Sequence, residues 1–469
     1  MVIGGSIAGL MSARVLSDHF AKVVILERDQ LSGQPEASKS TPQGRHVHAL
    51  LEAGLRALED LFPGLAREMV DEGAELADLT RDAAWLQAGS WKVRFEGGIE
   101  SILVTRPHLE WKVRGRVTAL PNVELRQGSS VMELRTEASR TRVTGVKVKG
   151  PEGEYVLEGD LVVDASGRGS RAPQWLEALG CGRVEQEQVG IDLGYTSRLY
   201  ERPAGFDEWK MLVVNGQAPE HRRSGFISNV EGGRWIVSLN GYFGDHAPTD
   251  EEGFLAFARE LPTPHLYEYI REARALTAPV VHKIPSSRWL HYERMGHFPE
   301  GFVLLGDAVC ALNPVFGQGM TVSMLGAKML GAHLARARGS PTGPRQGLSR
   351  GFQAELGKLL GLCWFLTTTL DLMHPQAQGK RRPGLKLLQW SVMNMIDLTS
   401  MDVKSCRAFW EVLHMRKGLE GLLQPGFSSS LLAYSVKSLL VPREKRANLH
   451  TLPLAPERTS QQDPAPRSW

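Results

Sequence analysis

The sequence predicts an α/β fold: a parallel sheet with a β-meander, an inserted antiparallel sheet and a helical C-terminal region. Three observations support this fold class. Apolar runs at 1–3, 22–26, 161–164 and 301–305 have the composition of buried parallel strands, and each leads into glycines or an acid. Residues 189–243 alternate apolar and polar side chains between glycine turns, as antiparallel strands do. From residue 332 onward the pattern is helical.

The bulk composition excludes several classes of protein. A chain of 469 residues holds two or three domains or one elaborated α/β unit. A net charge of +3, without a basic stripe, argues against nucleic acid as a partner. The four cysteines form no C-x-x-C pair, which argues against a zinc site or a disulfide framework. With no signal peptide and no membrane-spanning run visible, we expect a cytoplasmic protein.

The N-terminal segment has the pattern of a dinucleotide-binding βαβ unit. A glycine-rich turn follows the first strand and opens a helix, and the second strand ends at an acid. Gly4 permits the tight turn, Gly9 lets the helix pack closely, and Glu27 is placed to accept from ribose hydroxyls. Ser6 replaces the usual middle glycine; its hydroxyl can donate to phosphate, although the backbone approaches less closely. The predicted cofactor-binding residues are Gly4, Gly5, Ser6, Ala8, Gly9, Glu27 and Arg28.

A second motif lies at residues 301–320. The strand at 301–305 ends at Gly306 and Asp307, where open α/β sheets bind ligands. A glycine loop and a helix N-terminus follow, and together they suit a diphosphate or a partly negative ring edge. Taken alone, the segment also fits an ordinary strand, loop and helix. The predicted site residues are Gly306, Asp307, Pro314, Gly317, Gln318, Gly319 and Met320.

These motifs, with the segment 164–171, resemble the FAD-dependent monooxygenases of the para-hydroxybenzoate hydroxylase type. The resemblance implies that Asp307 holds the ribityl chain and that the loop at Gly317 and Gly319 lies against the isoalloxazine. It also implies that Ser166 and Gly167 lie near the FAD diphosphate, in a segment linked to NAD(P)H use. That family usually has an Asp-Gly pair at this point. The Ser166-Gly167 pair in its place puts the nicotinamide contact in question more than the FAD contact.

A third segment, TPQGRHVHALL at 41–51 with LFPGL at 61–65, resembles the bacterial polyether epoxidases and related FAD epoxidases. This resemblance implies that Arg45 lies near the flavin or its phosphates. Similar flavoproteins have an arginine at the Arg106 position that contacts FAD. A solvated arginine at 45 and a helix-entry salt bridge at 106 are the alternatives. His46 and His48 have no third ligand in sight, so we expect capping or loop packing and no metal.

The motifs and the composition predict a discontinuous organisation. The FAD-binding domain comprises 1–75, 96–183 and 285–345, and a substrate-side sheet comprises 76–95 and 184–284. A helical region follows at 346–450, and the tail at 451–469 is expected to be disordered. The meander is expected from strands at 122–125, 131–135, 142–148 and 154–157. Trp235, Val237 and Leu239 share one strand face, as core or as a cavity wall.

The resemblance implies a monooxygenase with non-covalent FAD that uses NADPH or NADH and O₂. It would epoxidise or hydroxylate an apolar, polyene- or polyketide-like small molecule through a flavin C4a-hydroperoxide. The flavin carries this chemistry, so no catalytic side chain is assigned. The alternatives are an isoprenoid double-bond reductase of the geranylgeranyl reductase type and a non-catalytic flavin-binding protein. Peripheral membrane contact through the basic loop 379–383 and the apolar helices stays open, as does the oligomeric state.

Overall fold

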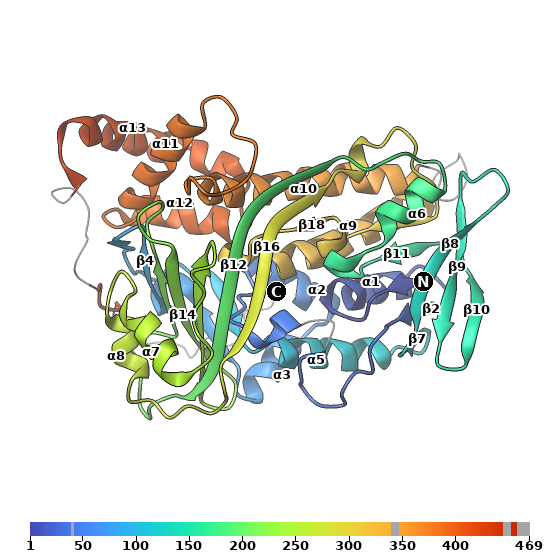
Figure 1. Ribbon diagram of the computed structural model, residues 1–469, viewed down its shortest axis with the longest axis horizontal. Helices are drawn as coiled ribbons and strands as arrows, with labels where there is room; N and C mark the ends of the chain where they lie inside the picture. Colours follow the sequence, from blue (N-terminus) through green and yellow to red (C-terminus); the bar gives the residue numbers. More distant parts are fainter. Residues whose placement is uncertain (39–41, 339–346, 444–451, 457–469) are drawn as a thin grey trace.

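The computed structural model describes residues 1–38, 42–338, 347–443 and 452–456. A parallel sheet and a larger, mostly antiparallel sheet lie toward opposite ends of the molecule, and helices of the C-terminal part gather at one end (Figure 1). This arrangement confirms the predicted fold class. Most of the tail at 451–469 lies outside the described residues.

The parallel sheet has five strands in the order β17-β11-β1-β2-β7. All four neighbouring pairs run parallel. β2 has the sequence VVIL and is buried along its whole length, as a strand covered on both faces should be. The strand bounds are β1 Val2–Ile3, β2 Val23–Leu26, β7 Val123–Arg126, β11 Val162–Asp164 and β17 Phe302–Leu304.

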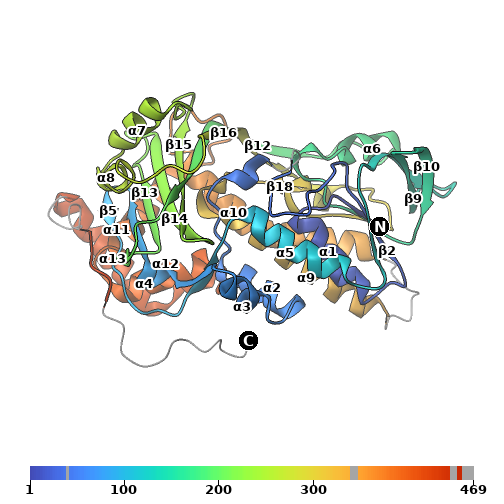
Figure 2. The same ribbon diagram turned by 90° about the horizontal axis from the view of Figure 1, so that it is seen from below.

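Helices cover the parallel sheet. α1 (Ile7–Ser17) joins β1 to β2 and packs against α5 (Arg106–Thr118) and α9 (Gln318–Arg338) (Figure 2). α2 (Glu52–Leu61) packs against α9 and is followed by α3 (Leu65–Asp71). α2 begins only at Glu52, because Leu51 before it has extended backbone. The short helix α6 (Ala172–Ala178) completes this half. The short helix α4 (Leu79–Asp82) belongs to the other half, where Leu79 packs in one cluster with Trp85 and Met211.

The β-meander is smaller than the sequence predicts. β8 (Ser130–Thr136), β9 (Val143–Gly150) and β10 (Gly153–Glu158) form an antiparallel sheet of three strands. The strand predicted at 122–125 was wrongly placed in this meander. It is β7, and it pairs parallel with β2 because α5 returns the chain to the edge of the parallel sheet.

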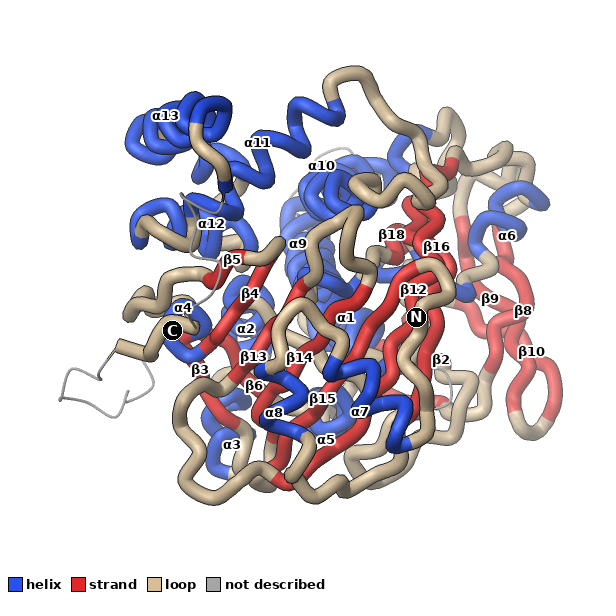
Figure 3. Tube along the Cα trace, turned by 60° about the vertical axis from the view of Figure 1, so that its left-hand side comes forward, coloured by secondary structure: helices blue, strands red, loops and turns tan. Residues whose placement is uncertain are grey.

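The second large sheet has eight strands in the order β18-β16-β12-β15-β14-β13-β4-β5 (Figure 3). The predicted hairpin between Trp85 and Trp91 is β4 and β5, which pair antiparallel at one edge. A separate pair joins β3 (Glu75–Asp78) to β6 (Glu100–Leu103). The bounds are β4 Ala83–Gln87, β5 Ser90–Trp91, β12 Gln186–Glu201, β13 Met211–Asn215, β14 Arg223–Val230, β15 Arg234–Tyr242, β16 Val280–Leu290 and β18 Cys310–Ala311.

One face of the eight-stranded sheet is covered by α7 (Glu251–Arg259) and α8 (His265–Ile270). Trp235, Val237 and Leu239 are fully buried on this face. They cluster with Phe254 and Leu266 of the two helices. Of the two interpretations left open by the sequence, this face is therefore core rather than a cavity wall.

The opposite face meets the C-terminal helices. These are α11 (Leu385–Leu398), α12 (Val403–Leu413) and α13 (Pro425–Leu440), which follow the long α10 (Leu348–Asp371). Among the described residues no helix is long and apolar enough to cross a bilayer. Short 3-10 turns are η1 Pro42–Arg45, η2 Gly167–Gly169, η3 Tyr292–Arg294, η4 Gly306–Ala308, η5 Pro314–Phe316 and η6 Leu419–Leu423.

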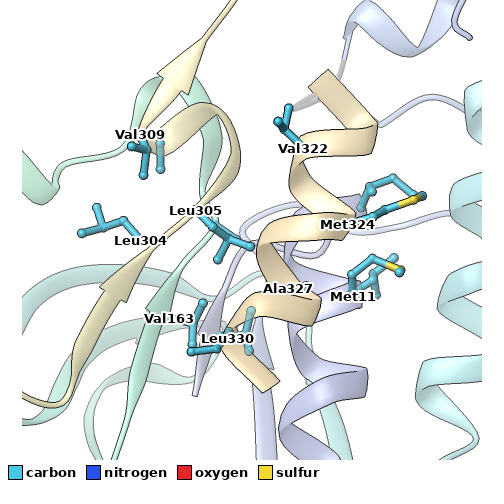
Figure 4. Packing of buried hydrophobic residues seen from close by; sticks show 14 of the residues in the cluster. Met11, Val163, Leu304, Leu305, Val309, Val322, Met324, Ala327 and Leu330 are labelled. Carbon is cyan, nitrogen blue, oxygen red and sulfur yellow. The ribbon is translucent and has the colours of Figure 1, made fainter. Parts of the chain in front are cut away.

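The largest apolar core runs through α9. Met324 is fully buried there, and its side chain lies toward Met11 of α1, while Leu305 lies on the other side of α9 (Figure 4). Because α9 carries the glycine loop at its start, this core also fixes the position of the loop.

Replacing Met324 with alanine should therefore lower the free energy of unfolding by about 2–5 kcal/mol, since a buried side chain is lost and a cavity remains. Met401 is 42% exposed, and Met401→Ala is the matched control with an expected change within about 0.5 kcal/mol. Urea titration of both variants measures the difference. Equal losses at the two positions would contradict a central role for α9 packing.

Candidate functional site

Three turns meet at the carboxyl ends of β1, β11 and β17, which are neighbours in the parallel sheet. Gly4 has a φ of +103°, and a Cβ there would lie 2.6 Å from the carbonyl oxygen of Ala165. A Cβ on Gly9 would lie 1.9 Å from the carbonyl oxygen of Gly4. Gly306, at φ +64°, lies against Ala8, whose Cβ would be 3.0 Å away from a Cβ at 306. The three motifs singled out in the sequence therefore converge.

The first turn leaves the N-terminus of α1 open. Ser6, the N-cap residue, has extended backbone, and its side chain makes no capping hydrogen bond. The first-turn N–H groups of a helix have no intrahelical partners, so they form an anion-binding site.

Glu27 is buried at the end of β2. It accepts hydrogen bonds from the backbone N–H of Gly5 at 2.6 Å and of Asp29 at 2.8 Å. These two bonds hold the glycine turn against β2. A carboxylate has further acceptor capacity, so Glu27 can also accept from a ribose hydroxyl. The neighbouring Arg28 is exposed.

Ser6 and Arg106 share one acidic partner, Glu110, which was not among the residues predicted from the sequence. The Ser6 hydroxyl donates to Glu110 Oε1 at 2.6 Å, and Arg106 Nε donates to the same oxygen at 2.9 Å. Arg106 Nη2 also donates to Ser6 Oγ at 3.1 Å. The helix-entry salt bridge expected as an alternative for Arg106 is therefore present, beside the glycine turn. The i,i+4 spacing of Arg106 and Glu110 was the available sequence signal.

The turn after β11 is organised from within. Asp164 is fully buried and accepts from the Ser166 backbone N–H at 2.9 Å and from the Ser166 and Ser170 hydroxyls at 2.6 Å each. Burial raises the pKa of Asp164, while these hydrogen bonds oppose the rise. The carboxylate of Asp164 therefore serves to stabilise the turn itself. Gly167 has a φ of +79°, and nothing lies within 4 Å of a Cβ built there.

Asp307 is half-buried in η4. Among the described residues no group donates a hydrogen bond to its carboxylate, and it caps no helix. Burial raises the pKa of Asp307, and the nearby guanidinium groups of Arg106, Arg168 and Arg288 oppose that rise. A carboxylate with this surplus acceptor capacity fits the hydroxyl groups of a bound ligand.

The loop from Pro314 to Met320 follows. Gly317 has a φ of +64°, and a Cβ there would lie 3.2 Å from the Cβ of Ala49. Gly319 is exposed, with open space around the position of a Cβ. Gln318 is only 3% exposed, and neither polar atom of its amide has a partner within the described part of the chain. Pro314 is half-buried and Met320 is buried.

The loop at 45–49 lies between the glycine loop at Gly317 and the eight-stranded sheet. His46 Nδ1 hydrogen-bonds to Ser197 Oγ at 2.7 Å, and Ser238 Oγ accepts from the Val47 backbone N–H at 3.0 Å. Burial lowers the pKa of His46 and of His48 to about 3, so both rings are neutral at pH 7. The histidines pack this loop as expected, whereas Arg45 is exposed and, within the described part of the chain, forms no hydrogen bond with the other predicted site residues.

A buried polar cluster beside the loop was not recognised from the sequence. Asn313 Nδ2 donates to Asp371 Oδ1 at 2.7 Å and to the Tyr242 hydroxyl at 2.9 Å. Within the described residues, Asp371 Oδ2 and the Tyr195 hydroxyl have no hydrogen-bond partner. Burial raises the pKa of Asp371 to about 7. The available signal was an aspartate in an otherwise apolar helical run.

One group with metal-ligand geometry occurs in the described segments: Glu185, Glu187 and His291. Arg294 already pairs with Glu185 at 2.6 Å, and Arg382 pairs with Glu187 at 3.3 Å. These cations compensate the carboxylates, and the group lies outside the three converging turns.

The convergent turns fit FAD. The closely packed glycines admit a diphosphate at the start of α1, Glu27 lies where a ribose would bind, and Asp307 has acceptor capacity for ribityl hydroxyls. The unbonded amide of Gln318 is available to the polar edge of a ring. The guanidinium of Arg106 supplies further donors beside the α1 turn.

Comparisons with known proteins agree with this geometry. The FAD dependent oxidoreductase family matches residues 1–190. Protein Rv3254 of Mycobacterium tuberculosis is 33% identical over 394 residues, covering 82% of each chain. Digeranylgeranylglycerophospholipid reductase 2 of Methanopyrus kandleri is 24% identical over 347 residues, covering 72% of this chain and 76% of that protein.

A solved structure supports the fold. PqsL of Pseudomonas aeruginosa, described as a probable FAD-dependent monooxygenase, superposes with a TM-score of 0.61 at 18% identity. The match covers 79% of this chain and 96% of that chain.

Gly9→Ala should distort the first turn, because the new Cβ has no room beside the Gly4 carbonyl oxygen. We expect a loss of about 1–3 kcal/mol in folding free energy, as for overpacked sites, together with weaker FAD retention. Gly115→Ala in α5 is the control, since nothing lies within 4 Å of its Cβ, and it should stabilise by about 0.4–1 kcal/mol. Urea unfolding and flavin absorbance measure both effects; equal behaviour of the two variants would contradict the close approach.

Asp307→Ala should weaken FAD binding by about 1.5–3 kcal/mol, the usual loss for hydrogen bonds to a charged acceptor. The apo protein should melt close to wild type, because the described residues give this carboxylate no structural partner. Melting curves with and without FAD measure the difference.

Asp402→Ala supplies the contrast for that experiment. Asp402 caps α12 by accepting from the Ser405 backbone N–H at 2.8 Å. Its loss should cost about 0.5–2 kcal/mol with and without FAD alike. If Asp307→Ala showed this same parallel drop, the assignment of Asp307 to the cofactor would be wrong.

Proposed function

Because the chain belongs to the FAD-dependent oxidoreductases, we propose that it is a flavin-dependent monooxygenase acting on an apolar small molecule. It uses NADPH or NADH and O₂ to epoxidise or hydroxylate a substrate such as a polyene or a polyketide. Bound FAD supplies the activation of O₂. The likeness to a probable FAD-dependent monooxygenase supports this choice at the level of fold.

The observation that carries the proposal is an apolar cluster beside the glycine loop. Phe316 of η5 and Ala49 pack against it. On the sheet side it contains Trp85, Met211 and Val213, with Phe226 half-buried at its margin. The C-terminal helices close it with Met395, Phe409, Trp410 and Phe427.

Such surroundings suit an apolar substrate and exclude water from the loop. Phe316 and Phe226 are only partly buried, so the cluster keeps some accessible aromatic surface. The chain therefore brings an apolar surface next to the segment from Pro314 to Gly319. A reaction with an intermediate that water would destroy needs apolar surroundings of this kind.

The polar groups here are few. Asp371 is the carboxyl group whose pKa of about 7 lets it hold or release a proton near neutral pH. It acts through Asn313, the residue before Pro314, because Asp371 accepts a hydrogen bond from the side-chain amide of Asn313. We assign no side chain to the oxygen transfer itself.

A second candidate is reduction of an isoprenoid double bond. The 24% identity to a digeranylgeranylglycerophospholipid reductase favours it, because that match extends over 72% of this chain. The same apolar cluster would accommodate an isoprenoid. The two reactions differ in their need for O₂.

Product analysis under ¹⁸O₂ separates the candidates. With NADPH or NADH and candidate polyenes, we expect products that carry one ¹⁸O atom, and no product without O₂. Asp307→Ala protein, depleted of flavin, is the control for background oxidation. Products that gain two hydrogens anaerobically, and never oxygen, would replace the monooxygenase proposal with the reductase.

A further inference from the structure

The outer faces of α11 and α13 are unusually apolar for a protein surface. On α13, Leu432, Leu439 and Leu440 are 67%, 72% and 80% exposed, and Val436 is 53% exposed. On α11, Leu387 is 66% exposed and Trp390 is 36% exposed. Contiguous exposed apolar side chains of this size mark interaction surfaces.

The exposed residues of α13 share one side of the helix. Leu432, Val436, Leu439 and Leu440 stand at spacings of three, four and eight residues, which bring them to the same face. The opposite side is docked, since Phe427 and Tyr434 are buried. The helix is therefore apolar on its outer face as well as on its packed face.

The two helices form one end of the molecule. Asn394 Nδ2 of α11 lies 3.4 Å from Ser435 Oγ of α13. Both helices lie at the outer margin beyond the eight-stranded sheet, with α13 outermost (Figure 1). Their exposed apolar residues thus face outward from the same part of the fold.

The exposed charges on α11 and α13 have one sign. Lys386 on α11 and Lys437 on α13 are both exposed. α13 has no acidic residue, and the one acid of α11, Asp397, is buried. Trp390 adds an aromatic side chain of the kind that favours the membrane–water interface.

We propose that α11 and α13 form a membrane-surface anchor that rests on bilayers containing anionic lipid. The apolar side chains enter the boundary between head groups and acyl chains, and the lysines contact the lipid phosphates. The helices lie on the bilayer and do not cross it. This inference stands independently of the reaction that the protein performs.

A second copy of the chain fits this surface less well. A two-fold dimer would bring the same patch from both copies together. Lys386 and Lys437 would then face a surface of like charge, with no exposed acid on either helix to pair with. An anionic lipid surface complements the patch without that conflict.

Vesicle sedimentation tests the anchor. The full chain loaded with FAD is mixed with vesicles of phosphatidylcholine alone or with phosphatidylglycerol added. We expect binding to the anionic vesicles that weakens as salt is raised, because salt screens the lysine contribution. Absence of binding to the anionic vesicles would overturn the proposal.

Two variants separate the apolar and the charged contributions. Leu432→Ser with Val436→Ser, Leu439→Ser and Leu440→Ser should abolish sedimentation. Lys386→Glu with Lys437→Glu should reduce partitioning by about fivefold or more for each lysine, because each basic group near an anionic surface contributes a factor of about five.

Val156→Ser with Val281→Ser is the matched control, since these valines are 52% and 41% exposed elsewhere on the surface. This control should bind like wild type. Retained flavin and an unchanged melting temperature show that each variant is folded. Equal vesicle binding by the serine variant of α13, or a concentration-dependent dimer that the same substitutions abolish, would reject the lipid anchor.

Discussion

The arrangement of the site depends on one constraint: three backbone turns approach one another more closely than side chains would allow. Gly9 lies against the carbonyl of Gly4, Gly4 lies against the carbonyl of Ala165, and Gly306 lies against Ala8. Through these contacts the turns after β1, β11 and β17 fix one another. Glu27 and Asp164 then hold two of the turns by accepting backbone and hydroxyl hydrogen bonds.

Local patterns predicted most of the fold. Apolar runs ending at Glu27, Asp164 and Gly306 identified parallel strands, because burial on both faces leaves a readable composition. The strand at 122–125 was predicted correctly but assigned to the wrong sheet, because the residues of a strand do not determine which neighbouring strand it pairs with. The same limit applies to Trp235: alternation predicted its face, and only the position of α7 and α8 shows that this face is core.

Part of the candidate site was less accessible from the sequence. Glycines in the three motifs were visible because their spacing is local. Asp371 and Asn313 are 58 residues apart, and Tyr242 is 71 residues from Asn313, so their hydrogen bonds depend on tertiary packing alone. This cluster ties the end of α10 to the residue before Pro314. The helical region therefore helps to position the glycine loop and is more than a cover over it.

The eight-stranded sheet has a consequence for how the chain folds during synthesis. β4 pairs in parallel with β13, and its Ala83 meets Met211, about 130 residues later in the chain. At about 5–20 residues per second, a newly made β4 waits roughly 6–25 s for this partner. During that interval the strand AAWLQ has an unsatisfied edge and an apolar side chain at Trp85. The edge of β4 that β13 covers in the finished fold therefore stays open to other partners until the second half of the sheet has left the ribosome.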